Sequence, residues 1–390
     1  MSACSDAQAR CLRVVQCFRA PIGGLFRHVG DLARGLARQG VAVGLICDDA
    51  DYGELEARRL SELADACPLG LSRIPMARLA SAGDVAAVRE VRRLVRERRI
   101  DLVHGHGAKG GAYARIAARL AGRAALYTPH GGSLHYSAAS ASGFAYLALE
   151  RALRRLGGPV LFESAFAEAV YRDRVGAPPA LSRVVHNGLR PDEFEPVETR
   201  ADAADLLFIG ELRALKGPFV LIEALARLAG QGPCPSLLVV GDGPDRAALA
   251  AAIPDRLKRH VTFAPPMPAR QAFARARLVV MPSLAESLPY IVLEAAAAAR
   301  PMIAARTGGI PEIFGSQADR LVAPGDAAAL AAAIAGALRE PAAGERAAAR
   351  LRDEVALGFS IDRMVEAILA TYREVLAETV TLSRPPGRTG

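Results

Sequence analysis

The sequence predicts an α/β protein built from two doubly wound domains, each a parallel sheet with helices on both faces. Short apolar runs alternate with amphipathic stretches along most of the chain, the pattern of repeated strand–helix units. This alternation stops at 187–204, where proline and acidic residues gather as in a linker, and then resumes. A chain of 390 residues with 51% hydrophobic and 23% charged residues is long enough for two such domains.

The first half of the chain contains the elements of one such domain. Residues 28–40 form an amphipathic helix, because apolar side chains recur at helical spacing and Gly40 follows as a stop signal. The strands expected in this half are 11–18, 41–47, 100–106, 124–128 and 159–164, and the further helices are 89–99, which is strongly basic, and 111–122.

The second half repeats the pattern after the linker. The expected strands are 205–210, 236–241, 261–265, 278–283 and 301–306, and the expected helices are 218–230, 244–252, 268–276, 289–300 and alanine-rich helices from 326. In doubly wound domains ligands bind beyond the carboxyl ends of the strands, so two facing domains imply one interdomain cleft.

Composition excludes several classes of protein. No run of eighteen apolar residues occurs and the amino end lacks a signal-peptide pattern, so we expect a cytoplasmic protein. The six cysteines are scattered without a CxxC pair, which disfavours a metal cage or a disulfide framework. The absence of Trp and the 5% aromatic content leave few stacking platforms for nucleic acid.

The net charge of +8 includes a basic stretch within 73–123. A solvated helix explains this stretch as well as peripheral contact with an anionic membrane surface does. Only three of the 49 basic residues are lysines, namely Lys109, Lys216 and Lys258. A lysine retained in so arginine-rich a chain can mark a site that needs a compact point charge.

Three loops of the first domain carry candidate binding residues. Gly23 and Gly24 lie between a strand and a helix, where backbone amides can approach an anion, although a tight turn explains them equally well. In "HGHGAKGG", His106 and Lys109 follow a strand, and Lys109 suits a carboxylate, hydroxyl or phosphate of an acceptor. His130 in "TPHGG" is presented at a strand end and can bond a sugar hydroxyl.

A metal site is the weaker interpretation of these histidines. His104 and His106 are two apart on a strand and so point the same way, but the sequence offers no third ligand nearby. Lys109, for its part, could be an ordinary exposed lysine. We therefore expect no metal.

The second domain carries the stronger signals. In "GELRALKG", Arg213 and Lys216 precede a helix and form a candidate diphosphate site, with Arg as a planar fork and Lys as a point charge. In "ESLPYIVLEA", Pro289 suits the first helical turn, so Glu286 lies in the loop before the helix and Glu294 lies inside it. The rise of about 1.5 Å per residue separates the two by several ångströms along the axis.

The ordered set "GG…H", "TPHGG", "HNG", "GELRALKG", "GDGP", "PSLAESLPYIVLEA" and "GGIPEI" resembles family 4 of the retaining glycosyltransferases, which have the GT-B fold. The resemblance is strongest to bacterial transferases that build exopolysaccharide, capsule or lipopolysaccharide. It implies an amino-terminal domain over 1–190, a carboxyl-terminal sugar-nucleotide domain over 191–360, and a helix over 361–378 that returns to the first domain. We expect residues 379–390 to form a disordered tail.

The resemblance also implies roles in the second domain. Glu294 would bind the ribose of the donor, and Glu286 would lie at the donor sugar near its anomeric carbon. Arg213 and Lys216 would hold the diphosphate. The usual Gly-Phe-Gly after the first glutamate is replaced here by residues 287–290.

In the remaining loops, the resemblance places Gly23 and Gly24 at the phosphates and His130 at the donor sugar. Gly308 and Gly309 would shape the loop beside the donor. His106 and Lys109 are candidates on the acceptor side.

The function expected from these observations is transfer of a hexose from a UDP- or GDP-sugar to a lipid-linked or polysaccharide acceptor, with retention and without cofactor or metal. A sugar-nucleotide epimerase of the same fold and a non-catalytic sugar-nucleotide-binding protein remain as alternatives.

Overall fold

The computed structural model describes residues 11–132 and 140–382, and these fold into two α/β units. Unit 1 comprises the described residues up to Glu163, together with Ala167–Val185 and the segment from Ile361 onward. Unit 2 comprises Ser164–Phe166 and His186–Ser360. The α/β class with two Rossmann-like sheets, predicted from the alternation of strands and helices, is confirmed.

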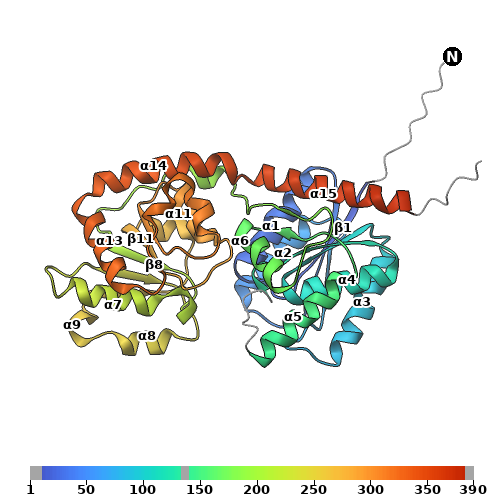
Figure 1. Ribbon diagram of the computed structural model, residues 1–390, viewed down its shortest axis with the longest axis horizontal. Helices are drawn as coiled ribbons and strands as arrows, with labels where there is room; N and C mark the ends of the chain where they lie inside the picture. Colours follow the sequence, from blue (N-terminus) through green and yellow to red (C-terminus); the bar gives the residue numbers. More distant parts are fainter. Residues whose placement is uncertain (1–10, 133–139, 383–390) are drawn as a thin grey trace, which may run out of the picture. The chain divides into compact units, whose positions relative to one another are not determined.

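The elements of the first half of the chain alternate as strand and helix (Figure 1). In chain order they are β1 Arg13–Cys17, α1 Gly23–Arg38, β2 Ala42–Asp48, α2 Glu54–Asp65, β3 Leu71–Ile74, α3 Gly83–Glu97, β4 Leu102–His106, α4 Gly107–Ala121, β5 Ala124–Thr128, α5 Ala141–Arg154, β6 Leu161–Phe162, α6 Ala165–Arg174 and β7 Arg183–Val184.

The elements that follow are mostly shorter. They are the 3-10 helix η2 Pro191–Phe194, β8 Ala204–Ile209, η3 Ala214–Lys216, α7 Pro218–Leu228, β9 Leu237–Val240, α8 Arg246–Ala252, α9 Asp255–Lys258, β10 Val261–Ala264, α10 Ala269–Phe273, β11 Ala276–Met281, α11 Tyr290–Ala297, β12 Met302–Ala304, α12 Ile310–Phe314, η4 Gly315–Arg320, α13 Ala327–Arg339, α14 Pro341–Gly358 and α15 Ile361–Leu382. Among the described residues no helix combines the length and the hydrophobicity needed to cross a bilayer.

The two main sheets share one strand order. In unit 1 the order is β3-β2-β1-β4-β5, in unit 2 it is β10-β9-β8-β11-β12, and every pairing in both sheets is parallel. The order reverses between β1 and β4, and again between β8 and β11. At such a switch point the helices that follow the two central strands lie on opposite faces, and a crevice opens beyond the strand ends.

Helices cover both faces of each sheet, which explains why the central strands are largely apolar. In unit 1 one face packs against α1, α2 and α15, and the other against α3 and α4. In unit 2 one face packs against α10, α11, α12 and α14, and the other against α7, α8, α9 and α13. Within β8 the side chains alternate between the two cores, with Leu206 and Phe208 on one face and Leu207 and Ile209 on the other.

The last helix is longer than the sequence predicted. α15 continues to Leu382, so residues 379–382, expected to belong to a disordered tail, are helical. No glycine or proline interrupts this stretch before Pro385, and the chain therefore has no strong stop signal at 378. The rest of the expected tail, 383–390, lies outside the described residues. α15 belongs to unit 1, where it contacts α1 (Figure 1).

The first helix begins earlier than predicted. α1 starts at Gly23, five residues before the expected start at His28. Gly23 and Gly24 are thus part of the first helical turn, not of a loop before it. Gly23 has a φ of +64°, a left-handed value that favours glycine and lets the chain turn sharply into the helix.

Candidate functional site

A lysine–glutamate pair lies at the switch point of unit 2. Lys216 ends the 3-10 helix η3 after β8, and Glu286 lies in the loop between β11 and α11. The Lys216 Nζ is 2.8 Å from each oxygen of the Glu286 carboxylate, and the Ser283 hydroxyl donates to Oε1 at 2.8 Å. The Glu286 side chain is only 7% exposed, whereas that of Lys216 is 27% exposed. Two residues that are 70 apart in sequence therefore form one charged centre that is open on the lysine side.

Close packing of two loops brings this pair together. A Cβ on Gly217, whose φ is +72°, would lie 1.9 Å from the Pro282 carbonyl oxygen, so only glycine allows the loop after β8 to approach the loop after β11. The Leu284 amide donates to the Leu215 carbonyl at 2.8 Å and joins the same two loops. The backbone thus fixes the distance between Lys216 and Glu286.

A third loop supports Glu286 from behind. Gly308 has a φ of +58°, and a Cβ there would lie 2.2 Å from the Glu286 carbonyl oxygen. The Gly309 amide donates to the Ser287 carbonyl at 2.6 Å. The two glycines predicted to shape this loop therefore touch the backbone that carries Glu286.

The stretch from Ser287 to Tyr290 is fixed, although it lacks the glycines that the resemblance led us to expect. Leu288 is buried in the core of unit 2, and the Asn187 side-chain amide donates to its carbonyl at 3.0 Å. Pro289 is the N-cap of α11, which agrees with the predicted start of the helix. Asn187 itself is buried, and sequence reasoning assigned it no role although it lies in the quoted "HNG".

The other two predicted residues of unit 2 lie to either side of this pair. Glu294 is half-buried, in the second turn of α11. Arg213 has an exposed side chain whose Nε lies 3.8 Å from Glu211 Oε1, an ion pair that contributes little to stability. In this structure the cation that meets Glu286 is Lys216, and the charge of Arg213 is directed to Glu211.

In unit 1 a buried hydrogen-bond network surrounds the switch point. The Gln16 amide Nε2 donates to the Tyr372 hydroxyl at 3.3 Å, and that hydroxyl is 2.7 Å from His104 Nδ1. His104 Nε2 lies 2.8 Å from Thr128 Oγ1, and His106 Nε2 lies 2.7 Å from Gln16 Oε1. Strand register explains the arrangement, because Gln16 on β1 is the partner of His104 on β4.

One proton pattern satisfies every donor in this network. Gln16 Oε1 can only accept, so His106 carries its proton on Nε2 and leaves Nδ1 as an acceptor. His106 Nδ1 is 3.0 Å from His130 Nε2, which must therefore donate. A neutral His130 then keeps an unprotonated Nδ1, which can accept a hydrogen bond from a substrate hydroxyl. Tyr372, on the last helix, is thus connected to His130 through Gln16 and His106.

His130 is held in an unusual backbone conformation. Its φ is +51°, a left-handed value that is uncommon for a residue with a side chain and that occurs often at functional sites. The Gly131 amide that follows donates at 3.0 Å to the buried carboxylate of Glu163. The backbone just after the imidazole is therefore held by a buried carboxylate of the same unit.

Burial keeps the histidines of this cluster neutral. Burial, reinforced by neighbouring imidazoles, holds the pKa of His104, His106 and His130 well below the ordinary value of 6.5. Neutral imidazoles are suited to exchanging hydrogen bonds with hydroxyl groups near neutral pH.

Three of the imidazoles could also hold a metal ion. Within residues 11–132 and 140–382, His28, His106 and His130 place ligand nitrogens within 4.8 Å of one another. The sequence did not indicate this set, because His28 comes from α1 and His130 from the loop after β5. His104, the expected companion of His106, is instead bonded to Tyr372 and Thr128. A bound metal would have to replace the His106–His130 hydrogen bond.

Lys109 meets a carboxylate of its own unit. Its Nζ is 2.6 and 2.7 Å from the two oxygens of Asp84, and the Tyr113 hydroxyl donates to the same carboxylate at 2.6 Å. Burial alone would raise the pKa of Asp84, but these hydrogen bonds outweigh it and the pKa is lowered. The sequence could not show this pairing, since Asp84 lies 25 residues away in the chain.

Two family models match the sequence. The model described as Glycosyltransferase Family 4 matches residues 22–193, and the model described as Glycosyl transferases group 1 matches residues 203–340. The two matches do not overlap, and together they span most of the chain.

Curated relatives include the D-inositol 3-phosphate glycosyltransferases of Mycolicibacterium paratuberculosis and Mycobacterium avium. The first is 36% identical over 233 residues, which are 54% of this chain and 51% of the relative. The second is 36% identical over 231 residues, which are 54% of this chain and 53% of the relative. The chain thus spans about half the length of the curated relatives that it matches.

Solved structures share the whole architecture. Sucrose-phosphate synthase from Thermosynechococcus elongatus has a TM-score of 0.77 at 22% identity, covering 95% of this chain and all of that one. Anabaena HepE in complex with UDP has a TM-score of 0.74 at 20% identity, covering 93% of this chain and 100% of that one. At these identities the likeness shows the fold, which is GT-B as expected.

Replacing Tyr372 by Phe should destabilise unit 1. The change leaves the buried Gln16 amide and His104 Nδ1 without their shared partner, and we expect the free energy of unfolding to fall by about 1–3 kcal/mol. The matched control is Tyr171→Phe, because the buried Tyr171 hydroxyl has no hydrogen-bond partner in the described part of the chain. Urea unfolding followed by circular dichroism measures both. If both substitutions changed the free energy of unfolding equally, the hydrogen bonds of Tyr372 would not contribute to stability as proposed.

Stability should also fall on mild acidification. His104 has a lower pKa in the fold than in the unfolded chain, so below pH 6.5 the unfolded state binds more protons and the free energy of unfolding decreases. Each such histidine contributes about 1.4 kcal/mol per pH unit until the folded form is protonated. His104→Gln should therefore give a shallower dependence between pH 6.5 and 5, measured by urea unfolding at each pH. His260→Gln, in unit 2, is the control, and an unchanged slope in His104→Gln would refute the explanation.

Proposed function

The chain belongs to the family 4, group 1 glycosyltransferases, and from this premise we propose that it transfers a hexose from a UDP- or GDP-sugar to a lipid-linked or polysaccharide acceptor in bacterial surface glycan synthesis. The observation that carries the proposal is the Lys216–Glu286 pair at the switch point of unit 2. α11 begins four residues after Glu286 and presents Glu294 in its second turn.

The pair suits the charges that develop when a sugar leaves a diphosphate. Negative charge grows on the departing oxygen, and fixed cations and helix amides stabilise it. An ammonium has three N–H groups, of which two point to the oxygens of Glu286, so a third remains for a phosphate oxygen. The Glu286 carboxylate in turn stabilises the positive character of the sugar. We assign Glu294 to the ribose and keep Arg213 as a second, outer contact to the diphosphate.

The environment of Glu286 favours retention of configuration. Its carboxylate oxygens already accept hydrogen bonds from Lys216 and Ser283, so they are engaged within the protein and are not directed to an acceptor hydroxyl. The departing phosphate can instead take the acceptor proton on the face that it leaves. Inversion would need a separate base on the opposite face of the sugar. His130 accepts a hydrogen bond from a sugar hydroxyl through Nδ1 and positions it.

The donor class has support from relatives of the same fold. HepE is described in complex with UDP and also with UDP-glucose. Because the cations and helix amides around Glu286 supply the electrostatic stabilisation, we propose that the transferase needs no metal or cofactor. Gly23 and Gly24, at the amino end of α1, are proposed to approach the phosphates.

For the location of the enzyme, we propose the cytoplasm with peripheral contact at the cytoplasmic face of the membrane. Part of the basic surface of α3 is used within the protein. Arg92 and Arg96 donate to the Leu120 carbonyl, and Arg93 pairs with Glu90 and Glu97. Arg89, the remaining arginine of α3, is exposed and would face anionic lipids.

Glu286→Gln should lower kcat by about a hundredfold or more, because removing one group that stabilises developing charge has this effect. Glu294→Ala should chiefly raise the KM for the donor. Both are measured as release of nucleoside diphosphate from UDP-glucose, UDP-galactose and GDP-mannose with alkyl glycosides as acceptors. Glu223→Gln, a change on the exposed face of α7, is the control.

Three outcomes of this assay would contradict the proposal. Full activity of Glu286→Gln would remove the proposed centre. Conversion of the donor sugar without any acceptor would indicate an epimerase. Loss of activity on dialysis against EDTA, restored by metal, would show that the reaction depends on an ion and would direct attention to His28, His106 and His130.

A further inference from the structure

Unit 1 contains a large pocket whose walls, apart from His130, are not part of the proposed donor site. Its volume is about 690 Å³, within the range of roughly 300–1,000 Å³ typical of small-molecule sites. The walls come from α1, α3, α4 and α5, from the last residue of β4 and from the loops after β1, β3 and β5. The pocket extends to His106 and His130, so it reaches the end of the hydrogen-bond network.

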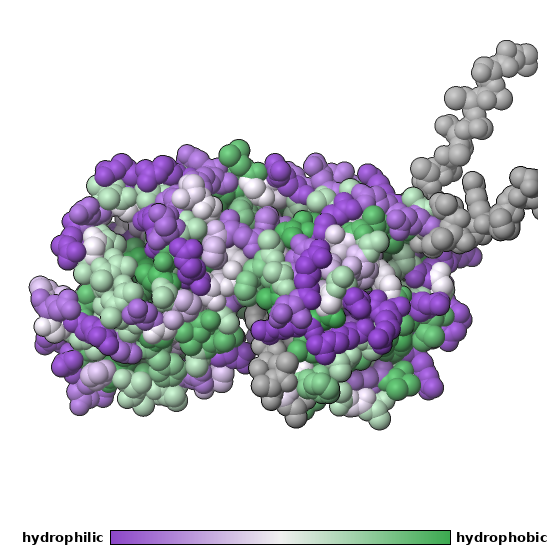
Figure 2. All heavy atoms as spheres, in the orientation of Figure 1, coloured by the Kyte–Doolittle hydropathy of each residue, from purple (hydrophilic) through white to green (hydrophobic). Residues whose placement is uncertain are grey.

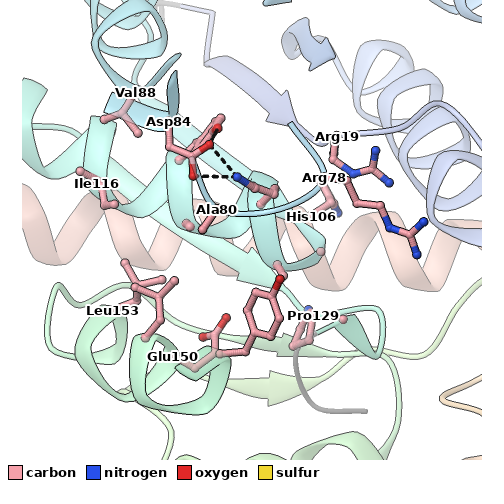
Figure 3. A pocket seen from close by; sticks show the side chains of 18 of the residues that line it. Arg19, Arg78, Ala80, Asp84, Val88, His106, Ile116, Pro129, Glu150 and Leu153 are labelled. Carbon is pink, nitrogen blue, oxygen red and sulfur yellow. Dashed lines mark hydrogen bonds and ion pairs between the residues drawn. The ribbon is translucent and has the colours of Figure 1, made fainter. Parts of the chain in front are cut away.

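The two ends of this pocket differ in chemistry. Figure 3 shows the apolar side chains of Val88, Ile116 and Leu153 at one end. At the other end Arg19 and Arg78 lie beside His106. A ligand that fits both ends must have an apolar body and an anionic head.

The acidic residues in the walls do not oppose an anion. Asp84 is paired with Lys109, as the dashed lines in Figure 3 show. Glu150 accepts two hydrogen bonds from Arg115, at 3.0 and 3.1 Å, in a buried ion pair. Arg78 makes no hydrogen bond or ion pair with residues 11–132 or 140–382, and it is exposed. The positive charge at the polar end is thus available to a ligand.

Large apolar side chains around the pocket are unusually exposed for a protein surface. Four large apolar side chains that line the pocket are about half exposed: Ile22 at 47%, Val85 at 56%, Leu120 at 52% and Leu149 at 47%. Single exposed residues of this kind are common, but several around one pocket mark a binding surface. Hydrophobic residues also lie along the edge formed by α5 and α3 in the face that Figure 2 shows.

We propose that this pocket binds the acceptor as an amphiphile, with its hydrocarbon chain against α3, α4 and α5 and a phosphate or diphosphate head at Arg19 and Arg78. This inference rests on the proposed function, because only a transferase has an acceptor. Of the two acceptors considered there, it favours the lipid-linked one over the polysaccharide. A glycan chain would leave the apolar walls in water, whereas a hydrocarbon chain covers them. The head group then lies beside His106 and His130.

The test uses dodecyl phosphate as the probe, titrated by calorimetry below its micelle concentration into the full chain without nucleotide. We expect saturable binding that is at least about tenfold tighter than that of inorganic phosphate or of dodecanol, because both ends of the pocket contribute. Leu149→Glu and Arg78→Ala should each weaken it by about tenfold or more. The matched controls are Leu55→Glu and Arg59→Ala, exposed positions on α2 outside the pocket.

Several results would overturn the proposal. One is the absence of saturable binding of dodecyl phosphate, and another is that inorganic phosphate or dodecanol binds as tightly as dodecyl phosphate does. The proposal would also fail if Leu149→Glu bound dodecyl phosphate as tightly as its control Leu55→Glu. The same holds if Arg78→Ala bound it as tightly as its control Arg59→Ala. Titration of the same proteins with UDP- and GDP-sugars separates this proposal from the proposed function. If dodecyl phosphate binds as expected but no sugar nucleotide does, the assigned transferase activity fails and the amphiphile pocket stands. If only sugar nucleotides bind, the pocket proposal alone fails.

Discussion

Strand order is the constraint on which the sites of both units depend. In each sheet the chain moves outward from its first strand in one direction and then returns to continue on the other side of that strand. The loops after β8 and β11 therefore become neighbours, although about 70 residues separate them. The helices that follow these two strands, α7 and α11, pack on opposite faces of the sheet, so charged groups can be collected beyond the strand ends.

The same constraint has different chemical results in the two units. At β8 and β11 it creates a charged centre, in which Lys216 and Glu286 satisfy each other until a substrate arrives. At β1 and β4 it creates a neutral centre, in which the buried side chains of Gln16, His104 and His106 are joined by hydrogen bonds through Tyr372 and to each other. A charged centre suits a diphosphate and a developing sugar cation, whereas a neutral one suits hydroxyl groups. The chemical difference between the two centres follows from the side chains on and just after each pair of central strands.

The sequence indicated individual residues of these sites better than it indicated which residues pair with one another. Alternating apolar runs predicted the two sheets, and the rarity of lysine drew attention to Lys216 and Lys109. The partners could not be read from the sequence, because pairing with Glu286 and Asp84 depends on strand order and loop packing. The position of Gln16 could have indicated its role, because it is a polar residue within the apolar strand 11–18. Nothing in the sequence indicated the role of Tyr372. It lies 356 residues from Gln16, on a helix with an ordinary amphipathic pattern.

If the donor site is as proposed, the loops around Lys216 and Glu286 bind the sugar nucleotide. Amide hydrogen exchange of the full chain with and without UDP can detect this binding. Bound nucleotide should slow exchange in segments 210–217, 286–294 and 308–309, because these loops carry the pair and the amino end of α11. Unchanged exchange in these three segments at saturating nucleotide, with protection elsewhere in the chain, would contradict the account.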